Sequence, residues 1–539
     1  MSNSQNQTET VFINGNIYTV DAAFSKATAL AARGQELVYV GDSAEAAKAA
    51  VSPGAKVVDL GGKTVVPGLI ESHVHFLGEG QRLAEIDIYW KPKAEILQKV
   101  AAEAAKRGPG EWIVSRGWNQ EAWEDNSWPS KEDLDAVAPR NPVALMRVDY
   151  HSVWVNTPAL AAAGVNRDTP DPQGGEILRK ADGDLQGILL DTAMDPLWAA
   201  VPPLSEARAM ELYRLAQAEM LECGITSIGN ASQNLRDHAI LDNTYADGSM
   251  KLRIYEIMLM HEQAERDFIK AGNRPFMGKY GERLSMNCIK VIGDGALGSR
   301  SAWLRGDYAD RPGHRGTPCF TDAELYDFTR LARDNGYQAS IHGIGDAEVG
   351  QILDTYEKVL GELPLEDHRY RIEHFQMVVP EDMKRAVRLR IAPIMQAIHC
   401  TSDYKMASLR LTKADIAKSY LWREIIDAGL FIAGGSDGPV EPVSPFYGMH
   451  SSVTRTNADF EPACGWNRQW AMTRQEALKS YTIWAAWAEF GDKRKGSLEA
   501  GKLADFAVLD RDLMTCPENE IISTRVLRTV IGGETVYEA

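Results

Sequence analysis

The 539-residue sequence predicts an α/β fold, in which a barrel of eight parallel strands carries a small β-sandwich domain built from both termini and an inserted subdomain after its first strand. Three observations predict this architecture. Short apolar runs alternate with helical stretches along the middle of the chain, both ends are rich in β-forming residues, and one interval between successive strands is much longer than the others.

Both ends of the chain have the character of short β-strands. Residues 11–20 place the turn pair Asn14-Gly15 between two β-rich runs, and Gly532-Gly533 forms a hairpin turn near the other end. Neither end alone supplies enough strands for a sandwich. We therefore expect the termini to pair into one composite β-sandwich domain, made of residues 1–66 and 495–539.

Between the ends, apolar runs of strand length alternate with helical sequence, which is typical of βα units and a parallel sheet. One helix is predicted at 322–335, after the start signal Thr321-Asp322, and another at 347–360. We assign the barrel to residues 67–77 and 206–494. The eight expected strands are 65–76, 225–229, 252–259, 286–292, 337–342, 370–374, 390–394 and 430–434.

The interval after the first strand is anomalous. It covers 150 residues from His75 to Ile225, whereas His342 and His374 are 32 residues apart. We therefore expect an inserted lid subdomain at 78–205, because an insertion at this point of a barrel overhangs the face where the strands end. The segment holds seven of the 13 tryptophans, which predicts either an aromatic core of its own or an apolar substrate pocket.

The charge balance and the cysteine spacing narrow the classes of partner. The chain has 75 acidic and 58 basic residues, a net charge of −17, so we expect no nucleic acid and no membrane as a partner. The six cysteines form no Cys-x-x-Cys pattern, and the sequence contains no apolar run of about 18 residues. We expect a cytoplasmic protein with reduced thiols that acts on a small molecule, and the sequence leaves a homo-oligomer open.

Six residues that can bind metal ions stand in or at the ends of the predicted strands. His73 and His75 end the first strand, and residues two apart in a strand point the same way, so both rings can face one metal ion. The other four candidates are Lys290, His342, His374 and Asp437. Because the strands of a barrel end on one face, we expect a metal site at that face.

Around these residues the sequence resembles the amidohydrolase superfamily, in particular amidohydrolase family 3, which includes N-substituted formamide deformylases. The resemblance covers nearly the whole chain and implies a TIM-like metallo-barrel. The matching motifs are Val66-Pro-Gly-Leu-Ile-Glu-Ser-His-Val-His75, Lys290-Val-Ile-Gly-Asp-Gly-Ala-Leu-Gly-Ser-Arg300, His342-Gly-Ile-Gly-Asp346, Arg371-Ile-Glu-His374, Gly435-Ser-Asp437 and Gly496-Ser-Leu-Glu-Ala-Gly-Lys-Leu-Ala-Asp505.

The resemblance implies a role for each candidate ligand. His73, His75 and Asp437 would hold one divalent ion and His342 and His374 a second, and Lys290, carboxylated by carbon dioxide, would bridge the two. Zinc is the first choice, with manganese, iron and cobalt as alternatives. A plain ammonium on Lys290, paired with Asp294 or Asp437, is the alternative to carboxylation.

The implied chemistry is hydrolysis of a non-peptide carbon–nitrogen bond in a small amide, an N-substituted formamide or a cyclic amide. Two metal ions would activate a bridging water, and Asp437 would accept its proton as general base and pass it to the leaving nitrogen as general acid. The resemblance therefore implies an amidohydrolase enzyme.

Two other functions stay open. A mononuclear deaminase of the same superfamily pairs the fifth-strand histidine with a glutamate, whereas here no glutamate follows His342 before Glu348, although Asp346 could serve as an acid. The second alternative is a non-catalytic regulatory or ligand-binding barrel, since a fold does not dictate a function. The complete set of six polar ligands argues against that alternative.

Two residues of the insertion are candidates for substrate contact. Trp118 and His151 lie in patterns that recur in amidohydrolase family 3, Arg116-Gly-Trp-Asn119 and Asp149-Tyr-His-Ser-Val-Trp-Val-Asn156. Each has a plainer alternative, which is packing in the subdomain core for Trp118 and a structural role for His151. Outside the insertion, His399 follows the seventh strand closely enough to line the pocket.

Overall fold

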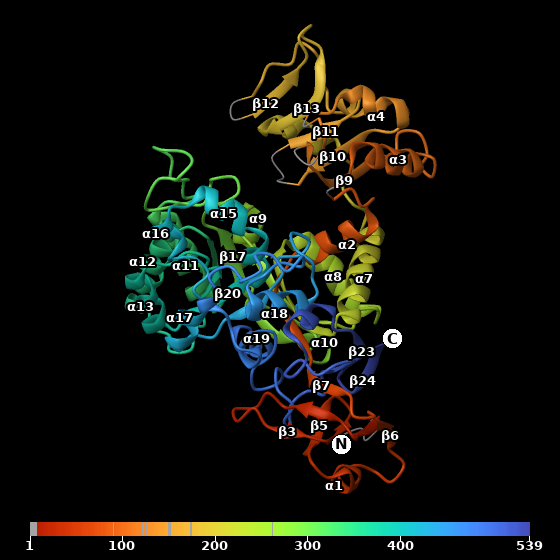
Figure 1. The fold of residues 1–539 in the computed structure, drawn as a ribbon, viewed down its shortest axis with the longest axis vertical. Coiled ribbons are helices and arrows are strands. Elements are labelled where there is room, and N and C mark those ends of the chain that lie inside the picture. The colour runs from red at the N-terminus through yellow and green to blue at the C-terminus, as the bar shows by residue number, and fades with distance from the viewer. Residues whose placement is uncertain are drawn as a thin grey trace. The chain divides into compact units, whose positions relative to one another are not determined.

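A computed structural model of the chain describes residues 8–539 except 90, 121, 122, 126, 149–151, 173, 174 and 261. The chain forms two compact units, Met1–Phe76 with Ala216–Ala539 and Leu77–Leu215 (Figure 1). The predicted insertion falls within the second unit, and the domain boundaries drawn from the sequence stay a prediction. In the described part of the chain, no helix is long and apolar enough to cross a membrane.

The first unit contains the predicted barrel, so the predicted fold class is confirmed. Eight strands lie side by side in the order β21-β20-β19-β18-β17-β15-β14-β8, and each neighbouring pair along this path is parallel. All eight coincide with strands expected from the sequence. They are β8 (Leu69–Val74), β14 (Ile225–Gln233), β15 (Arg253–Leu259), β17 (Leu284–Ile292), β18 (Gln338–Gly343), β19 (Arg371–His374), β20 (Ala392–Gln396) and β21 (Ala433–Gly435).

The first and last barrel strands are joined just beyond the end of β21. The Asp437 N–H donates to the carbonyl oxygen of His73 at 2.8 Å, and the His75 N–H donates to the carbonyl oxygen of Gly438 at 2.8 Å. These two bonds link the ends of the sheet path. They also fix the backbone of three predicted metal ligands in one short stretch of the barrel rim.

Helices cover the outside of the barrel because alternate strand residues face them. Ile341 of β18 belongs to the same buried apolar cluster as Leu325 of α11 (Asp322–Asn335) and Val349 of α12 (Asp346–Glu362). The residues on either side of Ile341 point to the opposite face of the strand. Both helices match the prediction. Helix α11 begins at a capping box, in which Thr321 and Glu324 satisfy each other's backbone N–H groups.

The two termini meet in one sheet. The strand β22 (Phe506–Leu509) pairs antiparallel with β7 (Thr64–Pro67). The six-stranded sheet runs in the order β24 (Glu534–Glu538), β23 (Val526–Ile531), β22, β7, β2 (Asn16–Tyr18) and β3 (Lys26–Ala27). A second, four-stranded sheet runs in the order β5 (Glu36–Gly41), β4 (Ala29–Arg33), β1 (Glu9–Ile13) and β6 (Lys56–Asp59). Phe12 of the second sheet meets Phe506 of the first edge-on, with ring centroids 4.9 Å apart, inside a shared apolar core.

The two glycine-containing turns differ in what they connect. Gly532 and Gly533 both have positive φ and join β23 (Val526–Ile531) to β24 (Glu534–Glu538) as the predicted hairpin. Asn14-Gly15 instead takes the chain from one sheet to the other, because β1 (Glu9–Ile13) and β2 (Asn16–Tyr18) pair with different partners. The turn is present, but it makes no hairpin.

The second unit is built on a five-stranded sheet, which runs in the order β12 (Gly175–Arg179), β13 (Leu185–Asp191), β11 (Ser152–Val155), β10 and β9. Strands β9 (Ile113–Trp118) and β10 (Val143–Arg147) are parallel, and the other pairs are antiparallel. Helices α3 (Lys93–Ala104) and α4 (Lys131–Val137) contribute to a core that contains Trp118, Trp123 and Trp154. Several of the clustered tryptophans therefore build the interior of this unit.

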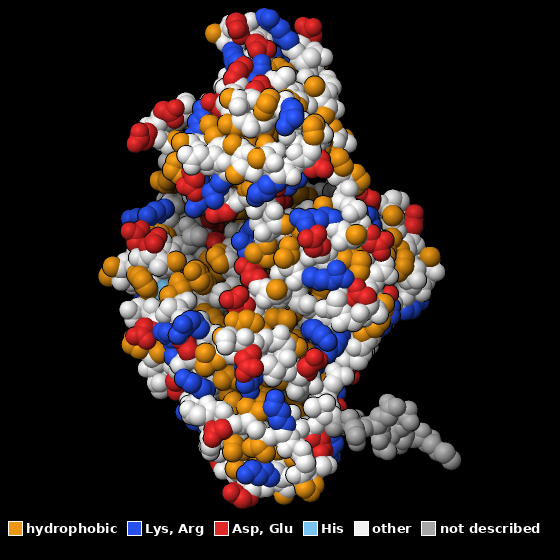
Figure 2. Space-filling view, turned by 90° about the vertical axis from the view of Figure 1, so that its right-hand side faces the viewer, with side chains coloured by type: hydrophobic (Ala, Val, Ile, Leu, Met, Phe, Trp, Pro, Cys, Tyr) orange, Lys and Arg blue, Asp and Glu red, His pale blue; other side chains and the backbone are white. Residues whose placement is uncertain are grey.

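Charged side chains of both signs are interspersed on the face drawn in Figure 2. Elsewhere in the described chain, charged side chains form local ion pairs, such as Arg385 with Glu357 at 2.8 Å and Arg423 with Glu476 at 2.8 Å. Ion pairs near the surface contribute little to stability, about 0–1 kcal/mol each.

Candidate metal centre

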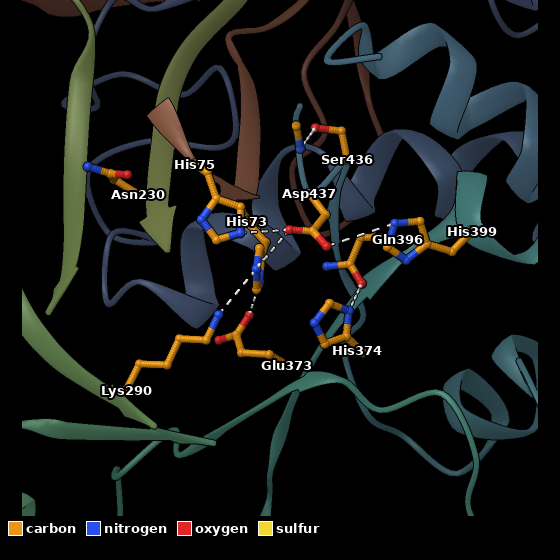
Figure 3. Close-up of polar contacts among 12 residues, drawn as sticks. His73, His75, Asn230, Lys290, Glu373, His374, Gln396, His399, Ser436 and Asp437 are labelled. Atoms are coloured by element: carbon orange, nitrogen blue, oxygen red, sulfur yellow. Dashed lines mark hydrogen bonds and ion pairs between the residues drawn. The ribbon is translucent and has the colours of Figure 1, made fainter. Parts of the chain in front are cut away.

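The candidate site lies at the carboxyl ends of the barrel strands, on the face predicted from the sequence (Figure 3). His73 is near the end of β8, Lys290 is near the end of β17, and His342 is near the end of β18. His374 is the last residue of β19, and Asp437 follows β21 by two residues. Parallel strands that end together thus bring residues from five distant parts of the sequence to one place.

His73, His374 and Asp437 form the centre of the site. One ligand atom from each residue lies within 4.8 Å of the other two, and all three residues are buried. His374 and Asp437 have φ angles of 71° and 61°, a left-handed conformation that strains residues other than glycine. Such strain, about 1–3 kcal/mol for each residue, persists where the surrounding structure enforces it and is typical of functional sites.

His75 extends this group through the Asp437 carboxylate. Asp437 Oδ1 lies 3.0 Å from His75 Nε2 and 3.4 Å from His73 Nε2, yet it has no hydrogen bond of normal geometry. Burial raises the pKa of Asp437, but the two histidine rings outweigh it and hold this pKa well below its ordinary value. Asp437 is therefore an anion that faces two imidazole nitrogens.

His73 is oriented from behind by a buried carboxylate. Glu373 Oε2 accepts a hydrogen bond from His73 Nδ1 at 2.5 Å, while Glu373 Oε1 accepts from Arg371 Nε at 2.6 Å and from the Ser340 hydroxyl at 2.7 Å. Burial raises the pKa of Glu373, but Arg371 and His73 together hold it well below its ordinary value. With its proton on Nδ1, the His73 ring presents the Nε2 lone pair to the site.

His374 is oriented in the same way by a neutral group. Its Nδ1 donates to the amide oxygen of Gln396 at 2.8 Å, so its Nε2 also carries a free lone pair. Burial, reinforced by the nearby His342 ring, lowers the pKa of His374 well below its ordinary value. The ring is neutral, which is the form that binds metal ions.

Lys290 lies inside the site. Its ammonium nitrogen is 3.3 Å from His73 Nε2, and the side chain is buried. Burial lowers the pKa of Lys290, against the opposing influence of Glu373 and Asp437. Within the described part of the chain, no ion pair within 4.0 Å joins Lys290 to Asp294 or Asp437, which were its alternative partners.

His342 stands beside the central group and not within it. Its ring centroid is 4.4 Å from that of His374, and burial lowers its pKa to about 3. Its Nε2 lies 3.4 Å from Asp294 Oδ1 without forming a hydrogen bond. Asp294 itself accepts backbone N–H groups from Ile344 and Gly345 at 3.0 and 2.9 Å, so it anchors the loop that follows β18.

Three further residues complete the site, and two of them, Glu373 and Gln396, carry only weak signals in the sequence. Glu373 precedes His374 and shares a strand face with Arg371, which strand alternation alone could have indicated. Gln396 is the last residue of β20, and a polar residue in an otherwise apolar, buried strand is a sequence signal for a site residue. His399 lines the site as predicted, with its Nε2 3.9 Å from Asp437 Oδ2.

Trp118, one of the two residues predicted to contact a substrate, packs within the second unit. The Trp118 side chain is fully buried in the core of the second unit, where its indole N–H donates to the carbonyl oxygen of Leu145 at 2.6 Å. This burial is the packing role named as the alternative, and contact with a substrate stays a prediction. His151 lies outside the described residues.

The residues present fit a divalent metal ion. Two imidazoles, those of His73 and His374, and one carboxylate, that of Asp437, are a donor set that zinc and related ions prefer. Asp437 Oδ1 and His342 Nε2 are buried without a hydrogen bond, although buried polar atoms normally have one. A cation held by these donors would satisfy them.

Comparison with known proteins agrees with this geometry. The family model described as "Amidohydrolase family" matches residues 56–537. The chain is 31% identical over 502 residues to a protein of Bacillus subtilis named as amidohydrolase YtcJ, covering 90% of this chain and 91% of that protein. It is 29% identical over 545 residues to the N-substituted formamide deformylase of Arthrobacter pascens, covering 98% of both chains.

A solved structure shares the fold. The crystal structure of an uncharacterized metal-dependent hydrolase from Pyrococcus horikoshii superimposes with a TM-score of 0.81 at 25% identity, covering 95% of this chain and 99% of that one. The chain belongs to the amidohydrolase family, and the predicted enzyme class, a hydrolase acting on carbon–nitrogen bonds, is confirmed.

Proposed function

We propose that this enzyme hydrolyses a non-peptide carbon–nitrogen bond in a small amide, an N-substituted formamide or a cyclic amide. One observation carries the proposal, which is the convergence of His73, His374 and the anionic Asp437 at the carboxyl face of the barrel. The similarity to an N-substituted formamide deformylase supports formamides as a substrate class. Water adds to the amide carbonyl, the carbon–nitrogen bond breaks, and a carboxylic acid and an amine or ring-opened product result.

His73, His75 and Asp437 would hold one metal ion, His342 and His374 would hold a second, and Lys290 would be available to both; among these residues, His73, His374 and Asp437 have ligand atoms within 4.8 Å of one another. We propose two divalent ions, zinc first, and a carboxylated Lys290. The bound metal supplies a Lewis acid that lowers the pKa of water and polarises a carbonyl oxygen. Lys290 is suited to carboxylation because its amine is buried 3.3 Å from His73 Nε2 and unpaired with Asp294 or Asp437.

Asp437 is the residue that we assign to proton transfer. Its two oxygens face different groups, with Oδ1 toward His73 and His75 and Oδ2 toward His399. As an anion it can accept the proton of the attacking water and then donate it to the leaving nitrogen. The left-handed backbone at Asp437 fixes the carboxylate in this position.

The deaminase alternative rests on a glutamate beside His342. Asp294 occupies the position 3.4 Å from His342 Nε2, and Glu348 packs against Gly293 with both carboxylate oxygens buried and without partners. This arrangement favours the amide hydrolase.

A cytoplasmic location remains our proposal, because all six cysteines are free thiols.

The test combines metal analysis with a substrate panel. Metal-loaded enzyme is assayed with N-substituted formamides, acyl amides, cyclic imides and amino-substituted heterocycles, and its metal content is measured. Two metal equivalents with amide hydrolysis support the proposal. One equivalent with ammonia release from the heterocycles would establish the deaminase, and neither metal nor turnover would favour a binding protein.

A further inference from the structure

His399 is a mostly buried histidine that no step described so far uses. It lies in α14 (Ala397–Ser402), which begins directly after β20, and its side chain is only 12% exposed. Figure 3 shows the ring directed toward Asp437, on the opposite side of that carboxylate from His73 and His75. Since β20 ends at the carboxyl face, this helix delivers the ring to the rim of the site.

The ring is fixed in place, yet one of its nitrogens has no partner. It stacks on His374 with an interplanar angle of 15° and a centroid separation of 6.0 Å. Its Nε2 is buried without a hydrogen bond, and the nearest carboxylate oxygen, Asp437 Oδ2, is 3.9 Å away. A buried unpaired polar atom is unfavourable by about 1–3 kcal/mol, so its retention at an active site needs a functional explanation.

The geometry separates His399 from the metal ligands. The rings of His73 and His75 approach Asp437 Oδ1, whereas His399 approaches Oδ2. A hydrogen-bond donor on the far side of the general base is placed to meet a substrate and not the metal.

We propose that His399 is a catalytic residue whose Nε2–H donates a hydrogen bond to the carbonyl oxygen of the scissile amide. The inference rests on the proposed function, because it assigns a partner to the same substrate carbonyl. Negative charge develops on this oxygen as water adds, so the hydrogen bond strengthens toward the transition state. No proton needs to leave His399 in this role.

Two substitutions of His399 distinguish the effect of its hydrogen-bond donor from the effect of its planar ring. His399→Gln keeps an N–H near the position of Nε2, whereas His399→Phe keeps a planar ring and removes the donor. His399→Leu is a second donor-free variant in case the phenylalanine does not fold. The control is His368→Gln, because His368 is a buried histidine at the opposite end of β19, where its Nδ1 accepts the Tyr370 N–H at 2.9 Å.

The first readout is metal content, which should be equal in the wild type and all variants. The second is hydrolysis of 4-nitroformanilide, or of the best panel substrate, by metal-loaded enzyme. Loss of one such donor should lower kcat by roughly 10²–10³-fold in the phenylalanine variant while KM changes little. The glutamine variant should recover most of this loss, and His368→Gln should match the wild type.

Two results would overturn the proposal. Loss of metal in both His399→Gln and His399→Phe would make His399 a ligand, and wild-type kcat in His399→Phe would remove any catalytic role.

A separate test applies if the wild type hydrolyses no panel member, because the proposed function then fails. In that case, calorimetry measures whether His399 helps to bind methylphosphonate, a tetrahedral anion. Binding that is lost in His399→Phe and kept in His399→Gln sustains the donor role; equal binding in all, or none to the wild type, refutes it.

Discussion

Glu373 Oε2 lies 2.5 Å from His73 Nδ1, and this contact joins the predicted metal ligand to a buried ion pair with Arg371. The carboxylate fixes the tautomer and the ring plane of His73 at once. His374 receives a neutral counterpart from Gln396 at 2.8 Å. The two histidines therefore present the same nitrogen to the site but differ in basicity, because only one is backed by an anion.

The first prediction concerns this carboxylate. Glu373→Gln should weaken metal binding by roughly 10–100-fold, because the amide no longer stabilises the ligating form of His73. Competition with a chelator measures the affinity. The matched control is Glu256→Gln, which alters a buried carboxylate paired with His238 at 2.7 Å on the helix-facing side of β15. Equal metal affinity in the Glu373 variant and the wild type would show that His73 needs no such support.

The second prediction concerns Lys290. Lys290→Ala should leave a protein that binds about one metal ion or none, because the bridging anion is lost. Short carboxylic acids should partly restore activity by occupying the vacated volume and supplying two oxygens. Mass spectrometry under native conditions would detect carbon dioxide on the wild-type lysine. Full metal content and full activity in the alanine variant would rule out a bridging role.

The third prediction separates metal binding from proton transfer. Asp437→Asn should retain part of the bound metal but lose turnover, since an amide cannot accept the proton of water. His73→Ala should instead lose both metal and activity, while circular dichroism shows an intact fold, because barrel stability rests on its core layers. Near-normal turnover in Asp437→Asn would place the base on another residue.

The fourth prediction concerns pH and the buried Glu348. Burial, with a smaller contribution from Asp294, raises the pKa of Glu348 to about 9, above its ordinary value of 4.5. Between these values the folded state keeps a proton that the unfolded state has lost, so the free energy of unfolding falls as pH rises, by at most roughly 1.4 kcal/mol per pH unit.

Replacing this acid by its neutral isostere removes that dependence. The Tm of Glu348→Gln should therefore exceed that of the wild type by an amount that grows from pH 5 to pH 9. Thermal unfolding across this range measures the difference, with Glu476→Gln as a control at a half-buried carboxylate paired with Arg423. A constant difference between wild type and variant over the whole range would mean that Glu348 is ionised in the folded protein.

The sequence predicts the barrel well because strand length and spacing are local properties. All eight barrel strands and the helix at 322–335 follow from apolar runs and capping signals alone. Asn14-Gly15 lies between two strands as expected, but a turn pair fixes the local backbone and not the strand that lies beside it. Partner choice depends on the packing of the whole domain.

The same distinction applies to the site. His73, His374 and Asp437 could be found because metal chemistry restricts the residue types and strand ends restrict their position. The contacts of Glu373 and Gln396 cross between strands, so they depend on strand register and on side-chain rotamers. Those quantities are set by tertiary packing, which no single segment of the sequence encodes.

The metal content of a His73→Ala, His374→Ala double variant tests the central claim most directly. The two residues supply both imidazole donors of the central group, so the claim requires that they hold the metal on which hydrolysis depends. We predict about two equivalents per chain in the wild type and less than about one tenth of an equivalent in the folded double variant. Wild-type metal content in that variant would contradict the account.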